Sequence, residues 1–142
     1  MFHACSNYRK AKYPGIGLQI TNQYATNDKK LYAAILTTRG AAFKDLKDLL
    51  NAENYAQTAL SYNRSKYPLT LLGAIYYMYG RFAEGDRFFR EALSLGASAD
   101  VRDEEIKIAV ESADVIERKI IAEHLMLKDP NRYSWAEMYI EK

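Results

Sequence analysis

Histidine and cysteine are the residue types best suited to nucleophilic, general-base or metal chemistry, and this sequence has few of them. It contains two histidines, His3 and His124, and one cysteine, Cys5. His3 and Cys5 form a short pair near the N-terminus, but no second pair exists to complete a tetrahedral zinc site. Neither histidine stands in a recognisable nucleophile motif. We therefore expect no catalytic residue, no metal site and no cofactor, and we interpret His124 as a surface or half-buried helical residue.

Two other segments contain residue types that bind phosphate or metal ions. Residues 15–17 read Gly-Ile-Gly, but the third glycine, the Lys-Ser/Thr pair and the preceding strand of a phosphate loop are missing. Residues 103–105 read Asp-Glu-Glu, which is the acidic composition favoured in the first turn of a helix. We assign no ligand to either segment.

Twelve tyrosines raise the question of nucleic-acid binding, because aromatic rings can stack on bases. Aromatic and basic residues interleave over residues 8–13, where they would be able to contact phosphates. No groove-reading helix or nucleic-acid-binding module accompanies this segment. We therefore expect a protein partner and no nucleic acid.

The composition is that of one helical domain. The chain has 142 residues, of which 49% are hydrophobic, with only 7 Gly and 3 Pro. Few turn residues and many good helix formers favour an all-α fold. The longest central apolar stretch, residues 69–79, is far too short for a membrane span. A single cysteine excludes a fold built on internal disulfides, and we see no signal peptide, so we expect a cytoplasmic protein without a membrane segment.

Apolar residues recur at helical spacing along most of the chain. Gly80 and Gly96 stand where helix ends require a left-handed residue. Asp114 with Glu117, and Ser134 with Glu137, have the spacing of capping boxes. For residues 1–28 we favour a helical segment over a lone strand, which would have no sheet to join. The predicted helices span 30–46, 48–62, 68–79, 82–95, 103–113 and 114–128, with a polar connection over 97–102 and a short last helix from Ser134.

Small and aromatic residues recur at fixed positions in the two helices over 68–95, namely Leu72, Gly73, Tyr76, Gly85, Phe89 and Ala92. This pattern resembles the tetratricopeptide repeat, in which Trp-x-x-Leu-Gly-x-x-Tyr is followed by Ala-x-x-x-Phe and a closing Pro. The sequence departs from that pattern at Leu69, Gly85 and Ala97, which replace the Trp, the first Ala and the Pro. The resemblance implies antiparallel helical hairpins stacked as a short right-handed α-solenoid.

A fainter copy of the pattern lies 33 residues earlier, close to the family period of about 34. Its members Gly40, Phe43, Ala52, Ala59 and Leu60 fall opposite Gly73, Tyr76, Gly85, Ala92 and Leu93. We therefore divide the chain into an N-terminal helical segment (1–28), a degenerate repeat (29–65), a clear repeat (66–98) and an atypical C-terminal hairpin with a capping helix (99–142). Gly73 and Gly85 are expected where two helices cross, since a missing side chain lets the helix backbones approach each other.

The resemblance implies that the first helix of each hairpin lines a concave wall that binds a peptide or helix of a partner protein. The basic clamp with which some family members hold acidic chaperone tails is not expected here, because Thr, Ala and aromatic residues occupy most of its positions. We predict an apolar or mixed partner, with Tyr67, Tyr77 and Met78 as anchors. An alternative is that neighbouring helices, or residues 1–28 and 129–142, cover the wall. The predicted binding residues are Thr37, Ala41, Lys44, Tyr67, Thr70, Ala74, Tyr77 and Met78.

Charge is distributed unevenly along the chain. Lys and Arg outnumber Asp and Glu by eight to three over residues 1–50, the two balance over 51–100, and acidic residues lead by ten to seven over 101–142. This asymmetry permits a homo-oligomer formed by end-to-end stacking. The sequence thus predicts a protein-interaction scaffold, and the alternative is a regulatory or self-association domain of a larger multidomain protein.

Overall fold

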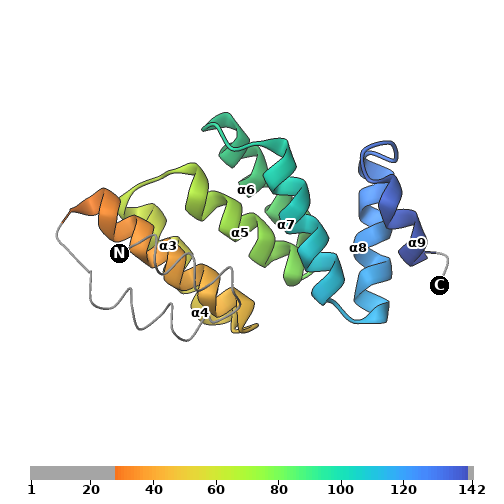
Figure 1. The fold of residues 1–142 in the computed structure, drawn as a ribbon, viewed down its shortest axis with the longest axis horizontal. Helices are drawn as coiled ribbons and strands as arrows, with labels where there is room; N and C mark the ends of the chain where they lie inside the picture. Colours follow the sequence, from red (N-terminus) through yellow and green to blue (C-terminus); the bar gives the residue numbers. More distant parts are fainter. Residues whose placement is uncertain (1–27, 141–142) are drawn as a thin grey trace.

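The protein is built from consecutive helical pairs. A computed structural model describes residues 28–140, and within that range it contains helices and no strand. The predictions for His3, Cys5, the Gly-Ile-Gly segment, the basic tyrosine-rich segment and the N-terminal helical segment fall on residues 1–27, which lie outside the described residues. Figure 1 shows the helices following one another along the long axis of the molecule. They are α3 (Lys29–Asp45), α4 (Leu49–Tyr62), α5 (Lys66–Met78), α6 (Phe82–Ser94), α7 (Ala99–Ser112), α8 (Val115–Lys128), the 3-10 turn η1 (Ser134–Ala136) and α9 (Glu137–Ile140).

The turns of the first two pairs have the same backbone hydrogen bonds, shifted by 33 residues. The amides of residues 46, 47 and 48 donate to the carbonyls of 42, 44 and 43. Those of 79, 80 and 81 donate to the carbonyls of 75, 77 and 76. Gly80 has a positive φ of 80°, and its counterpart Lys47 has a φ of 62° despite carrying a side chain. The prediction of a left-handed residue is confirmed at Gly80 and also at Gly96, where φ is 101°.

Glycines lie where the helices of a pair cross, as predicted. A Cβ atom built on Gly73 would lie 2.7 Å from the Phe89 ring, and one on Gly85 would lie 2.7 Å from the Tyr77 ring. In the preceding pair, a Cβ atom on Gly40 would lie 3.1 Å from the carbonyl oxygen of Ala52. The absent side chains therefore allow α5 to pack closely on α6, and α3 on α4.

One pair of stacked aromatic rings also recurs with the 33-residue period. Phe43 stacks on Tyr55 with ring centroids 5.2 Å apart and planes at 13°. Tyr76 stacks on Phe88 at 5.2 Å and 14°. Because Phe43 and Tyr76 occupy α3 and α5, and their partners occupy α4 and α6, the two pairs pack in the same way. The internal repeat is therefore a repeat of contacts as well as of residue types.

The C-terminal third departs from the predicted boundaries at two points. The helix expected over 103–113 begins at Ala99, because Ser98 caps it by accepting a hydrogen bond from the Val101 amide. Asp114 caps α8 through the Glu117 amide, as predicted. The prediction that Ser134 caps the last helix is wrong, since Ser134 lies inside η1, whose N-cap is Tyr133. A 3-10 turn thus replaces the first turn of the expected helix.

The core runs through α5, which contacts α3, α4, α6 and α7. Residues 68–77 of this helix are buried apart from the half-buried Thr70. On one side, Leu71, Leu72 and Ile75 pack against α4. On the other side, α5 packs on a cluster built from α7, α8 and the C-terminal turn. A helix that is apolar on all sides requires such neighbours, so α5 fixes the positions of α3 and α7 on either side of it.

Candidate functional site

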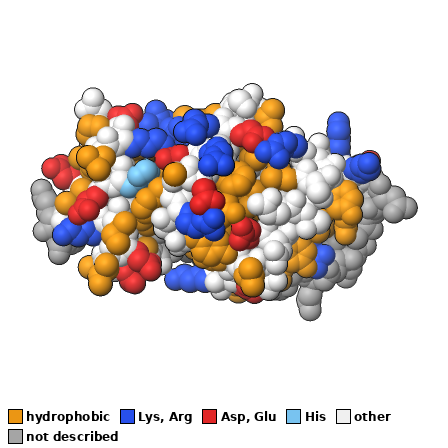
Figure 2. Space-filling model, turned by 180° about the vertical axis from the view of Figure 1, so that it is seen from behind, with side chains coloured by type: hydrophobic (Ala, Val, Ile, Leu, Met, Phe, Trp, Pro, Cys, Tyr) orange, Lys and Arg blue, Asp and Glu red, His pale blue; other side chains and the backbone are white. Residues whose placement is uncertain are grey.

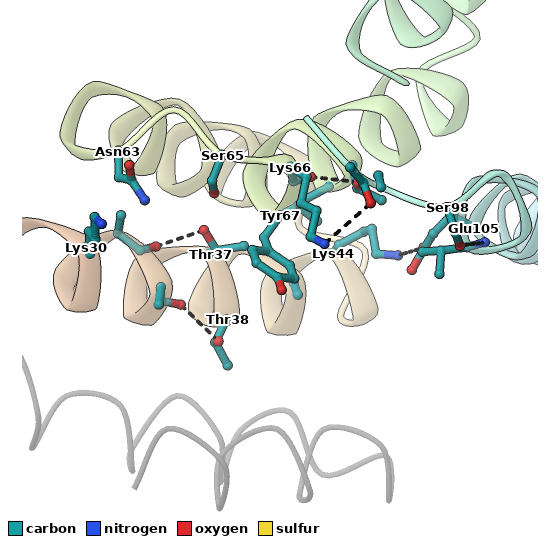
Figure 3. A pocket seen from close by; sticks show the side chains of 18 residues that line it. Lys30, Thr37, Thr38, Lys44, Asn63, Ser65, Lys66, Tyr67, Ser98 and Glu105 are labelled. Atoms are coloured by element: carbon teal, nitrogen blue, oxygen red, sulfur yellow. Dashed lines mark hydrogen bonds and ion pairs between the residues drawn. The ribbon is translucent and has the colours of Figure 1, made fainter. Parts of the chain in front are cut away.

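A groove of about 720 Å³ runs between α3, α5 and α7, the first helices of the three successive pairs. Figure 3 shows Lys30 at one end, the Lys44–Glu105 pair at the other, and the Tyr67 ring between them. The floor and walls consist mainly of small side chains and the aliphatic parts of larger ones. The lining residues include Ala33, Ala34, Thr37, Ala41, Ser65, Ala97 and Val101.

Five of the eight predicted binding residues lie together in this groove. Thr37, Ala41 and Lys44 line it from α3, and Tyr67 and Thr70 line it from α5. Tyr67 is 67% exposed, so its ring is available to a ligand. The first helices of the two repeats thus share one surface, which is the arrangement expected from the sequence.

The other three predicted residues are not in the groove. Ala74 and Tyr77 are 1% and 0% exposed, and they pack in the cluster formed with α7 and α8. Met78 is partly buried against the same cluster. The prediction that Ala74 and Tyr77 face a ligand is wrong. The third helical pair covers both residues, and the Tyr77 ring also packs against α6. Part of the alternative considered from the sequence, coverage by a neighbouring hairpin, therefore applies to these residues.

The hydroxyl groups on the groove wall are already engaged by their own helices. Thr37 donates to the Ala33 carbonyl at 2.8 Å, Thr38 to Ala34 at 3.0 Å and Thr70 to Lys66 at 2.7 Å. Each threonine therefore presents mainly its methyl group to a ligand. The middle wall of the groove is therefore apolar, although threonine is a polar residue type.

Charged side chains lie at both ends of the groove, and Lys66 lies between them (Figure 3). The Lys44 side chain is 4% exposed, and its ammonium lies 3.0 Å from the Glu105 carboxylate. This ion pair joins α3 to α7. Lys66 lies over the Tyr67 ring, with its nitrogen 5.4 Å from the ring centroid. Glu105 and Val101 could not be predicted as groove residues from the sequence, because α7 has no small-residue and aromatic register to align it with α3 and α5.

Removing the carboxylate of the Lys44–Glu105 pair is expected to cost more stability than removing the amine. Glu105→Ala leaves a buried ammonium without its partner, and we expect the free energy of unfolding to fall by about 1–2 kcal/mol, less than for a fully buried pair because Glu105 is 22% exposed. Lys44→Met keeps the aliphatic packing and leaves Glu105 in contact with water, so its loss should be under about 1 kcal/mol. Urea unfolding of both variants measures the difference, and equal losses would contradict this account.

A second polar cluster, which sequence analysis missed, lies between α5, α6 and α8. The Asp86 carboxylate accepts a hydrogen bond from the Tyr77 hydroxyl, lies 2.9 Å from the Lys128 amine and lies 3.2 Å from His124 Nε2. The His124 ring also stacks on Phe82 at 4.7 Å. His124 is thus a half-buried helical residue, as expected, but it takes part in an interhelical contact.

The electrostatics of this cluster favour an ionised Asp86. Burial raises the pKa of Asp86, but hydrogen bonds from Tyr77 and Lys128 outweigh it, and the pKa lies below its ordinary value. Burial, followed by the hydrogen bond to Asp86, raises the pKa of Tyr77. The carboxylate is therefore a fixed negative charge that joins three helices. None of these four side chains lines the groove, so the cluster and the groove are separate features.

The described residues offer no grouping of three or more His, Cys, Asp or Glu side chains suited to holding a metal ion. Across residues 28–140, no helix combines the length and apolar character needed to cross a membrane. The groove between α3, α5 and α7 is consequently the candidate site that the geometry supports.

Comparison with known proteins identifies no relative of this chain. No protein-family model matches the chain, and no similarity is found to a curated protein or to a solved structure. The class that the fold defines is an all-α helical-repeat domain.

Proposed function

We propose that this chain is a tetratricopeptide-like interaction domain that binds a peptide or a helix of a partner protein in the groove between α3, α5 and α7. The observation that carries the proposal is the convergence of Thr37, Ala41 and Tyr67 on one elongated groove with an apolar middle. Small side chains leave room for a ligand backbone, and an exposed aromatic ring offers a contact of high energy per area.

Three further observations support the tetratricopeptide-like interpretation. The crossing glycines Gly40 and Gly73, the turn hydrogen bonds and the stacked rings all recur with a 33-residue period. In such arrays, the first helices of successive pairs line a shared binding surface. The proposal therefore treats the protein as a scaffold with no catalytic role. We further propose a cytoplasmic setting, because a single cysteine supplies no internal disulfide.

The type of ligand follows from the surface of the groove. Methyl groups of threonine and alanine line its middle, Lys30 and Lys44 lie toward its ends, and Lys66 lies over Tyr67 between them (Figure 3). A ligand with small or medium apolar side chains in its centre is expected to bury them there. Backbone polar groups of an extended ligand would meet few free hydroxyl groups, so a helical ligand, which satisfies its own backbone, fits this wall better.

Filling the groove is expected to weaken ligand binding without unfolding the domain. We propose to select peptides from a display library on the wild-type protein and to measure their affinities by fluorescence anisotropy. Thr37→Arg places a long charged side chain in the groove, and we expect affinity to fall at least about tenfold, equal to about 1.4 kcal/mol. Arginine is a good helix former, so α3 should remain intact.

Thr58→Arg on α4 is the matched control. Thr58 is exposed, and its hydroxyl donates to the Asn54 carbonyl in the same i−4 geometry as that of Thr37. Because Thr58 is not among the groove residues, peptide affinity should stay at the wild-type value. The proposal fails if no peptide family is enriched, or if the enriched peptides bind Thr37→Arg as tightly as wild type.

A further inference from the structure

The helix α8 carries an apolar stripe on the side that faces away from the rest of the molecule. Ile116, Ile120 and Leu127 are 74%, 51% and 88% exposed. Their spacings of four and seven residues place them on one face of the helix. The opposite face, with Ile121, Ala122 and Leu125, is buried in the core. The helix is therefore apolar on both sides, and only one side is covered by the described residues.

Scattered exposed apolar residues are ordinary in proteins, but three on one face of a single helix indicate a contact surface. Figure 2 shows hydrophobic side chains interspersed with acidic and basic ones at the α8–α9 end of the molecule, on the left in that view. No residue of α8 lines the groove between α3, α5 and α7. The stripe therefore needs a function of its own.

Charged residues at fixed positions along the stripe select its partner. With about 100° of rotation per residue, Glu123 lies within the stripe between Ile120 and Leu127, and Lys119 lies beside it. An entirely apolar partner, such as a lipid interior, would leave the Glu123 carboxylate without compensation. The partner must therefore present a cation at the height of Glu123 and an anion at the height of Lys119.

A second copy of α8 in antiparallel orientation meets both requirements. When the two-fold axis passes midway between residues 116 and 127, Ile116 of one copy faces Leu127 of the other. The same operation places Glu123 of each copy opposite Ile120 of the other, one residue from the Lys119 of that copy. A parallel arrangement would instead place Glu123 against Glu123 in the centre of the contact. We propose that the protein self-associates through antiparallel pairing of α8 with α8 of a second copy.

This contact differs from end-to-end stacking in its symmetry. A two-fold contact uses the same surface on both copies and closes at a dimer, whereas a head-to-tail contact continues to add copies. Because one helix of 14 residues spans only about 21 Å, the buried area lies below the roughly 1,200 Å² of stable interfaces. We therefore expect a reversible dimer that forms as protein concentration rises.

Sedimentation equilibrium of the full chain, with reductant present so that Cys5 stays a thiol, tests the proposal. The mass is expected to rise with concentration from one chain of 16.3 kDa and to level off at two. Lys119→Glu or Glu123→Lys alone places like charges together on both sides of the two-fold axis, and each variant should remain a monomer. An equimolar mixture of these two variants should dimerise, because every Lys119–Glu123 position then again joins opposite charges.

Two apolar substitutions separate this contact from other exposed surfaces. Ile120→Glu should abolish the dimer, whereas Leu50→Glu, at a 68% exposed position on α4, should leave it intact. Circular dichroism verifies that each variant is folded. A wild-type protein that stays monomeric at about 1 mM, a mass that grows beyond two chains, a mixture that stays monomeric, or loss of the dimer in Leu50→Glu would each overturn the proposal.

Discussion

Gly73→Val is expected to lower the free energy of unfolding by more than about 3 kcal/mol. A Cβ atom at this position would lie 2.7–2.8 Å from three atoms of the Phe89 ring. Phe89 lies on α6 and is only 2% exposed. The ring cannot move away without disturbing the Tyr77 ring, whose centroid lies 5.7 Å from it. Valine adds two further methyl groups to this clash, so α5 and α6 must separate. Urea unfolding followed by circular dichroism measures the loss.

Smaller substitutions at the crossings calibrate this expectation. Gly73→Ala should lose about 2 kcal/mol, because a clash of about 3 kcal/mol is partly offset by the gain of about 1 kcal/mol in helix propensity. Gly40→Ala, where the nearest atoms lie 3.1 Å away, should stay within about 1 kcal/mol of wild type. In a double-mutant cycle, Phe89→Leu should reduce the cost of Gly73→Ala. Additive effects would show that the glycine is not needed for close packing.

The sequence was sufficient to predict the helices of the repeats, because their signals are local. The periodic apolar residues, the glycines after helix ends and the Asp114 cap each act within a few residues. The 33-residue period also identified Gly40 and Gly73 as equivalent crossing positions. It did not identify the matching rings Tyr55 and Phe88, although they too are separated by 33 residues and stack in the same way.

Features that depend on the third helical pair could not be predicted in the same way. Tyr77 was expected on an open wall, but its ring packs against Phe82 and Phe89 of α6 and lies in the cluster built with α7 and α8. The repeat pattern did not show that α7 and α8 cover this end of α5. The signal that was available is the uninterrupted apolar sequence of α5, which is typical of a helix buried on all sides. Nothing in the sequence indicated the positive φ at Lys47, because that φ is set by a turn of the same kind as the one that contains Gly80.

The groove was predicted in part for a related reason. Thr37, Ala41 and Tyr67 belong to helices that the repeat places side by side. Glu105 belongs to α7, which is aligned with them only by folding. A carboxylate that pairs with Lys44 across 61 residues has no local sequence signature. An interaction between residues so far apart in the sequence can be identified only once the packing of the helical pairs is known.

Asp86→Ala is expected to lower the free energy of unfolding by about 3 kcal/mol. The substitution leaves the buried Tyr77 hydroxyl without its acceptor and removes the carboxylate that holds Lys128 and His124 of α8. Hydrogen exchange should show faster exchange of the α8 amides, with little change in α3 and α4. Glu84→Ala, which removes an exposed ion pair with Arg81 on the same helix, is the control and should have little effect.

The acid dependence of stability provides an independent test of Asp86. Its pKa in the folded protein lies below the ordinary value of 3.8, so its contribution is complete above that value and is lost as the pH falls through the lowered pKa. The difference in unfolding free energy between wild type and Asp86→Asn should therefore be constant near neutral pH and shrink below about pH 3.8. A difference that stays constant down to pH 2 would mean that the charge of Asp86 does not stabilise the contact between α6 and α8, and that the hydrogen bond from Tyr77 alone accounts for its effect.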